Sequence, residues 1–299
     1  MELRVLRYFL AVAREGSMTG AANFLHVTQP TLSRQIKDLE DELGAKLFAR
    51  HSHSVTLTSA GMRLRKRAEE ILEMIEKTEA EFAVKEESIG GDIYIGSGET
   101  RVMRHLAEII HDIRKDYPDI HIHLYSGNSE DVTERLDKGL LDFGILIQPA
   151  DLSKYDYVNL PEKDVWGVFT RKDSHLAAKQ TITRLDLLGE PLILSRQAIR
   201  RTSAKNEFID WFKNDFERLN IIATFNLVYN ASVMAEKGIG HVVSISGLAD
   251  TSENSTLCFR LLEPRLETGL NIVWKKHQVF SPAANVFLRK IQESFGNIA

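Results

Sequence analysis

The sequence is poor in cysteine and contains no long hydrophobic run. Cys258 is the one cysteine among 299 residues, so an internal disulfide is excluded and a reducing, cytoplasmic setting is expected. The apolar neighbours of Cys258 indicate a buried thiol. No apolar stretch approaches the roughly 18 residues that cross a bilayer, and charged residues interrupt the first apolar stretch. We therefore expect neither a membrane partner nor a secretory signal.

The sequence motifs of common enzymes are also missing. The chain has no phosphate-binding P-loop, no dinucleotide-binding GxGxxG, no HExxH zinc motif and no GxSxG nucleophile elbow. Two pairs of histidines stand two residues apart, His51 with His53 and His121 with His123, but neither pair has a third ligand beside it. The sequence therefore predicts a protein that is not an enzyme, with no cofactor and no bound metal.

The charge is distributed unevenly, although the net charge of −4 alone argues against a nucleic-acid partner. The first 66 residues contain ten Lys and Arg against six Asp and Glu, whereas the remainder contains 28 against 36. A basic end on an acidic body is the asymmetry expected when one module meets phosphate. The length leaves room for more than one domain.

The spacing of apolar residues predicts three short helices before residue 45. Gly16 ends the first helix and Ser17 caps the second. Thr28 is expected to cap the third, with Pro30 tolerated in its first turn and Gly44 ending it. One face of this third helix is apolar and is expected to pack inward: Leu32, Ile36, Leu39 and Leu43. Its other face is polar.

A short helix, a tight turn and a polar-faced second helix make a helix-turn-helix. Residues 46–50 and 54–58 alternate as two strands around a polar tip, which predicts a wing. The polar face can pair with base edges or phosphates, because Gln suits adenine and Arg suits guanine. Helical spacing alone leaves open an ordinary three-helix bundle whose polar faces are solvated.

The residues themselves carry a longer pattern. Residues 21–44 contain Ala-Ala-x-x-Leu-x-Val-Thr-Gln-Pro-x-Leu-Ser-x-Gln-Ile-x-x-Leu-Glu-x-x-Leu-Gly, followed by Leu-Phe-x-Arg at 47–50 and Leu-Thr-x-Ala-Gly at 57–61. This pattern resembles the DNA-binding signature of LysR-type transcriptional regulators. The resemblance implies a winged helix-turn-helix domain over residues 1–58, with the helix that opens at Gln29 in the major groove of double-stranded DNA.

The resemblance also implies the residues that contact DNA. Base-facing and sugar-facing candidates lie at the start of the third helix: Gln29, Pro30, Thr31, Ser33 and Arg34. Lys37 and Arg50 are expected to contact phosphates, which position the domain without specifying sequence. His53, at the tip of the wing, is expected to be solvated or to touch a phosphate.

Residues 59–88 read as one long linker helix. This segment contains no proline, and its apolar residues follow heptad spacing at Leu64, Ala68, Ile71, Ile75, Thr78 and Phe82. Such a stripe needs a partner, and packing against the chain's own body is one alternative. Pairing with the same helix of a second subunit fits better, and the resemblance implies the same. A homodimer, and a homotetramer assembled through the C-terminal domains, are expected, with an imperfectly palindromic operator.

Residues 89–299 alternate between strand and helix patterns. Strands are expected at 92–96, 120–125, 143–147, 165–170, 192–194, 221–224, 241–245 and 271–274, and helices at 101–117, 129–138, 204–212, 231–237 and 282–295. This order predicts α/β architecture with parallel strands. The resemblance implies a two-lobed effector domain like periplasmic solute-binding proteins. Lobe I would span about 90–162 plus 268–299, and lobe II about 163–267.

Polar residues follow the expected strands where helices begin. The candidates for effector binding are Ser97, Thr100, Asn128, Ser129, Gln148 and Ser195. Hydroxyls and backbone amides at helix starts suit a carboxylate or another small anion, although plain helix capping explains many such residues. The sequence thus predicts a transcriptional regulator whose operator binding is modulated by a small, anionic effector between the lobes. The alternative is an α/β solute-binding or enzymatic protein with a non-functional DNA-binding head.

Overall fold

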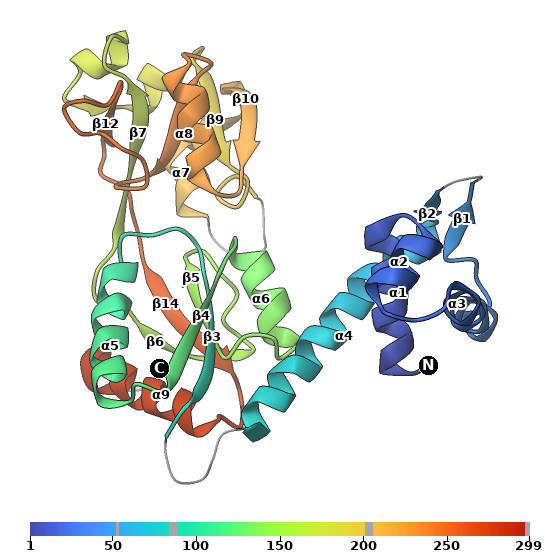
Figure 1. The fold of residues 1–299 in the computed structure, drawn as a ribbon. Coiled ribbons are helices and arrows are strands. Elements are labelled where there is room, and N and C mark those ends of the chain that lie inside the picture. The colour runs from blue at the N-terminus through green and yellow to red at the C-terminus, as the bar shows by residue number, and fades with distance from the viewer. Residues whose placement is uncertain (52–53, 84–88, 201–205, 297–299) are drawn as a thin grey trace. The chain divides into compact units, whose positions relative to one another are not determined.

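The structure is a computed structural model that describes residues 1–51, 54–83, 89–200 and 206–296. The chain divides into two compact units, Met1–Ala83 and Val84–Ala299 (Figure 1). His53 lies outside the described residues, and for Arg50 only the backbone is described.

The first unit contains the three expected helices and the wing. They are α1 (Leu3–Glu15), α2 (Met18–Phe24), α3 (Gln29–Leu43) and the antiparallel strands β1 (Phe48–Arg50) and β2 (Val55–Leu57). The hydroxyl of Ser17 caps α2 by accepting the backbone N–H of Gly20 at 3.2 Å. Phe9, Leu32 and Ile36 are fully buried between the helices. Helical periodicity therefore placed the core of this unit correctly.

Two details of α3 differ from the prediction. Leu43, which was expected to pack inward, is 42% exposed. It is the last residue of α3, and helical spacing predicts the direction of a side chain but not whether another element covers it. Glu40, three residues before Leu43, is buried instead, next to the buried Leu39. Thr28 occupies the N-cap position, but its hydroxyl pairs with that of Thr31 at 2.8 Å and caps no backbone N–H.

The linker segment forms α4 (Ser59–Ala83), and the predicted continuation through residues 84–88 lies outside the described residues. Its heptad stripe is divided between two environments. Its first part packs on the core of the first unit through Leu64, Ala68 and Ile71. For this part, packing against the chain's own body, one of the two alternatives, is correct. Thr78 is exposed and Phe82 is 85% exposed, so the distal end of the stripe has no covering group among the described residues.

The second unit contains two separate sheets. The first has five strands in the order β4 (Ile120–Ser126), β3 (Gly91–Ser97), β5 (Phe143–Ile147), β14 (Leu270–Lys275) and β6 (Tyr155–Asn159). Helices α5 (Met103–Asp116) and α9 (Pro282–Phe295) share one core with this sheet, whereas α6 (Ser129–Asp137) packs into another. Helices thus cover both faces of the first sheet.

The second sheet has seven strands. Its main path is β10 (Asn220–Phe225), β9 (Pro191–Ser195), β11 (His241–Ile245), β7 (Asp164–Arg171), β12 (Leu257–Leu262) and β8 (Thr181–Ile182), and β13 (Glu267–Thr268) pairs with β7. Helices α7 (Glu207–Phe212) and α8 (Val228–Glu236) pack in two different cores of this lobe, and short 3₁₀ turns occupy 175–178, 184–187 and 213–218. The thiol of Cys258 is buried in β12.

The chain passes between the two sheets twice, between β6 and β7 and again between β13 and β14 (Figure 1). The expected parallel arrangement is correct for β3, β4 and β5 and for β9, β10 and β11. It is wrong for β14 and β7, which run antiparallel to their neighbours β5 and β11. Both sheets are therefore mixed, because the crossing segments enter each sheet from the other lobe. The two-lobed α/β architecture itself is confirmed. Within the described ranges, no helix is long and apolar enough to span a bilayer.

Candidate functional site

The polar face of α3 is accessible in the first unit. Its predicted contact residues Gln29, Pro30, Thr31, Arg34 and Lys37 are exposed, and Ser33 is half-buried. Five of the six line a shallow groove, which Asp38 completes: Gln29, Pro30, Ser33, Arg34 and Lys37. The face is therefore free of intramolecular packing among the described residues, as contact with a duplex requires. Contact of each residue with DNA stays a prediction.

A buried carboxylate, which sequence reasoning missed, holds this helix to the wing. Glu40 is 4% exposed and accepts the backbone N–H groups of Leu47 at 2.8 Å and Phe48 at 3.2 Å. Its other oxygen accepts the ammonium of Lys46 at 2.8 Å. Burial alone would raise the pKa of Glu40, but these hydrogen bonds lower it below the ordinary value. The signal in the sequence was an acidic residue one position after the inward-facing Leu39.

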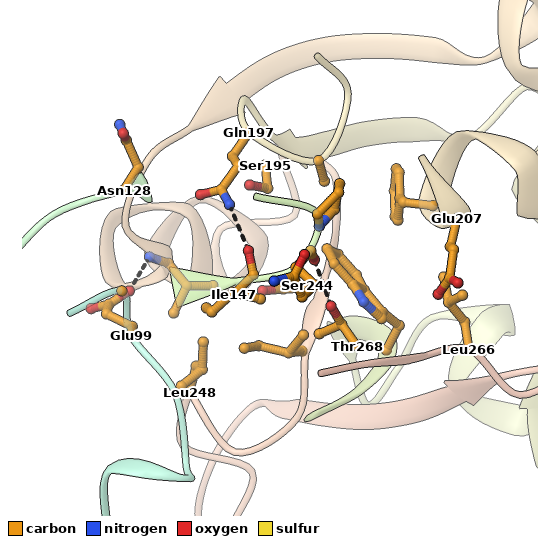
Figure 2. Close-up of a pocket in the computed structure, with 18 of the residues that line it drawn as sticks. Glu99, Asn128, Ile147, Ser195, Gln197, Glu207, Ser244, Leu248, Leu266 and Thr268 are labelled. Carbon is orange, nitrogen blue, oxygen red and sulfur yellow. Dashed lines mark hydrogen bonds between the residues drawn. The ribbon is translucent and has the colours of Figure 1, made fainter. Parts of the chain in front are cut away.

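The second unit contains a cavity of about 400 Å³ lined by residues of both lobes (Figure 2). Three of the six predicted effector residues line it: Asn128, Gln148 and Ser195. Two of these already have structural roles. The side-chain oxygen of Asn128 caps α6 by accepting the N–H groups of Glu130 and Asp131, and the side-chain oxygen of Gln148 accepts the N–H of Ala150.

The other three predicted residues do not line this cavity. The hydroxyl of Ser97 donates to the carbonyl of Gly98, and buried Thr100 donates to Asp164 at 2.6 Å. Ser129 lines a neighbouring cavity and is bound to Gln197. Hydrogen bonds within the protein therefore account for these side chains. The partners of Thr100 and Ser129 come from distant segments, which the sequence could not show.

Most residues that line the cavity were not predicted. Trp166, Phe208 and Phe225 contribute aromatic surface, and Ser244 and Thr268 contribute hydroxyls. Among the described residues, its charged lining consists of three carboxylates and one ammonium: Glu99, Glu207, Glu267 and Lys163. This balance does not favour the anionic effector expected from the sequence, since carboxylates repel anions.

Two side chains cross the cavity from one lobe to the other. Glu99, which follows β3, accepts the backbone N–H of Val228 at the start of α8 at 2.5 Å. Gln197, which follows β9, accepts the N–H of Ser129 at the start of α6 at 3.2 Å and donates to its hydroxyl at 2.6 Å. Figure 2 shows both side chains at the same side of the cavity. Each of the two helix starts is thus occupied by an acceptor from the opposite lobe.

Asp164 lies where the chain crosses between the lobes, at the beginning of β7. Burial raises the pKa of Asp164 to about 6, although the hydrogen bond from Thr100 acts in the opposite direction. Glu162 adds to the increase through repulsion, and Arg101 reduces it. A titratable group is therefore built into the crossing segment.

Comparison with known proteins covers both units. The family model for bacterial regulatory helix-turn-helix proteins of the lysR family matches residues 3–62, and the model of the LysR substrate binding domain matches residues 86–296. This chain belongs to the LysR family. The LysR match includes α3, the wing and both sheets of the second unit.

Relatives of this LysR protein align over its whole length. The chain is 30% identical to the Hca operon transcriptional activator HcaR of Escherichia coli, over 100% of this chain and 99% of HcaR. It is 29% identical to the uncharacterized regulator YvbU of Bacillus subtilis, over 99% of each chain. Among solved structures, CbnR in complex with its target DNA has a TM-score of 0.75 and 23% identity, covering 98% of this chain and 100% of CbnR.

These findings fix the general function. The chain is a LysR-type DNA-binding transcriptional regulator with an effector-binding domain, and it is not an enzyme. The alternative of an enzyme or solute-binding protein with an inert head is set aside, because the helix-turn-helix family model matches residues 3–62 and the relatives are named as regulators.

Proposed function

We propose that α3 reads an operator in the major groove and that a small molecule bound in the 400 Å³ cavity modulates this binding. The cavity carries the proposal, because it is enclosed by both lobes and combines aromatic surface with a few polar groups, as small-molecule sites do. A ligand there can shift the arrangement of the lobes only by its differential affinity for the two arrangements. We retain the prediction that the effector binds between the lobes, but not the prediction that it is an anion.

On the DNA side, the exposed residues of α3 divide into two roles. Gln29, Ser33 and Arg34 carry groups that can pair with base edges. Pro30 lines the groove beside them, and exposed Thr31 is assigned to the same contact with base or sugar. We assign Lys37, further along α3, and Arg50 of the wing to phosphate contacts, as the LysR signature implies. The proposal locates the protein in the cytosol, where its operator would be.

We further propose that the distal end of α4 pairs with a second copy. Phe82 and Thr78 continue the heptad stripe but are exposed, so the stripe lacks a cover within the described residues. A homodimer would bury this apolar surface and place two α3 helices on two half-sites of a near-palindromic operator. Assembly into a tetramer through the second units is the corresponding proposal for the higher oligomer.

The experiment begins with selection of the preferred duplex in vitro, followed by a metabolite screen against the full chain by thermal shift. We expect hits to change the operator affinity several-fold, and expect Asn226→Trp to abolish their effect, because exposed Asn226 lines the cavity and an indole would fill it. Operator affinity without effector should be unaffected by this substitution. Hits that still modulate the Asn226→Trp variant would contradict the cavity as the effector site.

A further inference from the structure

Glu99 occupies the position in this cavity where an anionic ligand could accept a hydrogen bond from the start of α8. Its carboxylate accepts the N–H of Val228, the first residue of the nine-residue helix α8. The N-cap residue Leu227 offers no side-chain acceptor to this helix. The partial positive charge of a helix start attracts anions, and here the protein's own carboxylate, which comes from the opposite lobe, already accepts one of its N–H groups.

The start of α6, the second helix start at the cavity, also has an acceptor from the opposite lobe. The N–H of Ser129, at the start of α6, donates to the side-chain oxygen of Gln197 at 3.2 Å. An effector carboxylate therefore finds an acceptor already at each start, and at α8 it would lie beside Glu99 or have to displace it. Two carboxylates side by side repel each other strongly where water is partly excluded.

The remaining charges among the described lining residues are two carboxylates and one ammonium. Glu207 has no hydrogen-bond or ion-pair partner among the described residues, and Figure 2 shows it at the opposite side of the cavity from Glu99. Glu267 is neutralised by Arg265 at 2.7 Å. Lys163 is the one basic side chain among the described lining residues, where the carboxylates of Glu99 and Glu207 outnumber it.

We propose that Glu99 sets the charge preference of the cavity, so that the effector is a neutral or cationic small molecule with an aromatic or apolar ring. A ring would lie among Trp166, Phe208 and Phe225, and a hydrogen-bond donor would face a carboxylate. This inference rests on the proposed function, since it assumes that the cavity is the effector site. Glu99 is thus a specificity-determining residue.

Three probes of nearly equal shape test this preference: benzamidine, benzamide and benzoate, with charges of +1, 0 and −1. Their dissociation constants are measured for the full chain by titration calorimetry. We expect benzamidine and benzamide to bind at least about tenfold more tightly than benzoate. Glu99→Gln retains an acceptor oxygen for Val228 but removes the charge, so the preference should fall to about threefold or less. Glu253→Gln, an exposed position outside the cavity, is the matched control and should retain the wild-type preference.

The Asn226→Trp variant separates this inference from the proposed function. If benzoate binds wild-type protein most tightly and Asn226→Trp abolishes that binding, the charge preference is overturned but the cavity remains the site. If probe binding survives Asn226→Trp, the cavity itself is contradicted.

If none of the three probes binds, a second measurement tests the role of Glu99. Glu99→Ala removes the carboxylate from the start of α8, and formate should then raise the melting temperature of the variant more than that of wild type. Absence of this difference, at matched ionic strength with chloride, would overturn the role of Glu99.

Discussion

The carboxylate of Glu40 and the backbone N–H of Leu47 are joined by a 2.8 Å hydrogen bond beneath the protein surface. The contact connects α3 with the residue before the first strand of the wing, and a second hydrogen bond reaches Phe48 of that strand. A helix that reads base edges must be held in register with the elements that contact phosphates, and a buried charge-assisted hydrogen bond supplies such a connection.

Glu40→Ala should destabilise the first unit by about 2–3 kcal/mol, because two buried N–H groups lose their acceptor. Urea unfolding of the full chain, followed by circular dichroism, measures the change. The exposed neighbour Asp41 provides the control, and Asp41→Ala should alter stability by less than about 0.5 kcal/mol. Equal effects of the two substitutions would show that the buried carboxylate is unimportant.

Lys37→Ala should weaken binding to all duplexes by a similar factor, because a phosphate contact carries no sequence information. The slope of log K against log salt concentration should decrease by about 0.9, the value for one lost phosphate contact. Fluorescence anisotropy at several salt concentrations gives both quantities. A loss confined to the preferred duplex would instead place Lys37 on a base edge.

The raised pKa of Asp164 predicts a pH-dependent stability of the second unit. In the unfolded chain this carboxyl loses its proton near pH 3.8, whereas in the folded unit it does so near pH 6. The folded state binds the extra proton between these values, so the stability contributed by Asp164 declines by about 3 kcal/mol as pH rises through this window.

Asp164→Asn should flatten that decline, since the amide can still accept the hydroxyl of Thr100 without a charge. The variant should also be more stable than wild type at pH 8. Thermal unfolding between pH 4 and 8 measures this, with Asp112→Asn on the exposed side of α5 as the control. A wild-type-like pH profile in Asp164→Asn would assign the dependence to other groups.

Phe82→Glu should shift the protein toward the monomer, because the substitution places a charge in the proposed contact between α4 helices. Analytical ultracentrifugation over a concentration series should show at least a tenfold weaker association. Val279→Glu changes a similarly exposed apolar residue in the second unit and should leave the monomer–dimer step unchanged. Unaltered association in Phe82→Glu would exclude this end of α4 from the interface.

Elements with strong periodicity were predictable from the sequence. The limits of α9 and β11 agree with their predicted residues, and Gly44 ends α3 in the left-handed conformation that glycine favours. Strand β6 was missed because Tyr155–Asn159 contains two polar residues in five. Strand β12 was missed although it is largely apolar, since its pairing with β7 is a long-range contact.

The site was less predictable than the fold. The outer face of α3 follows from one helix, so a single periodicity locates Gln29 and Arg34 together. The cavity instead combines segments more than 100 residues apart, such as Glu99 and Val228. A sequence pattern records which residues begin a helix, but not which acceptor from another lobe already occupies that start.

The most direct test of the account compares wild type and Arg34→Ala on the selected operator duplex and on a scrambled duplex at the same salt concentration. Wild type should prefer the operator by about 10³-fold or more, and Arg34→Ala should reduce this preference to about tenfold or less. Arg114→Ala, on the exposed surface of α5, should retain the wild-type preference. Equal affinity of the wild-type protein for the two duplexes would contradict the account.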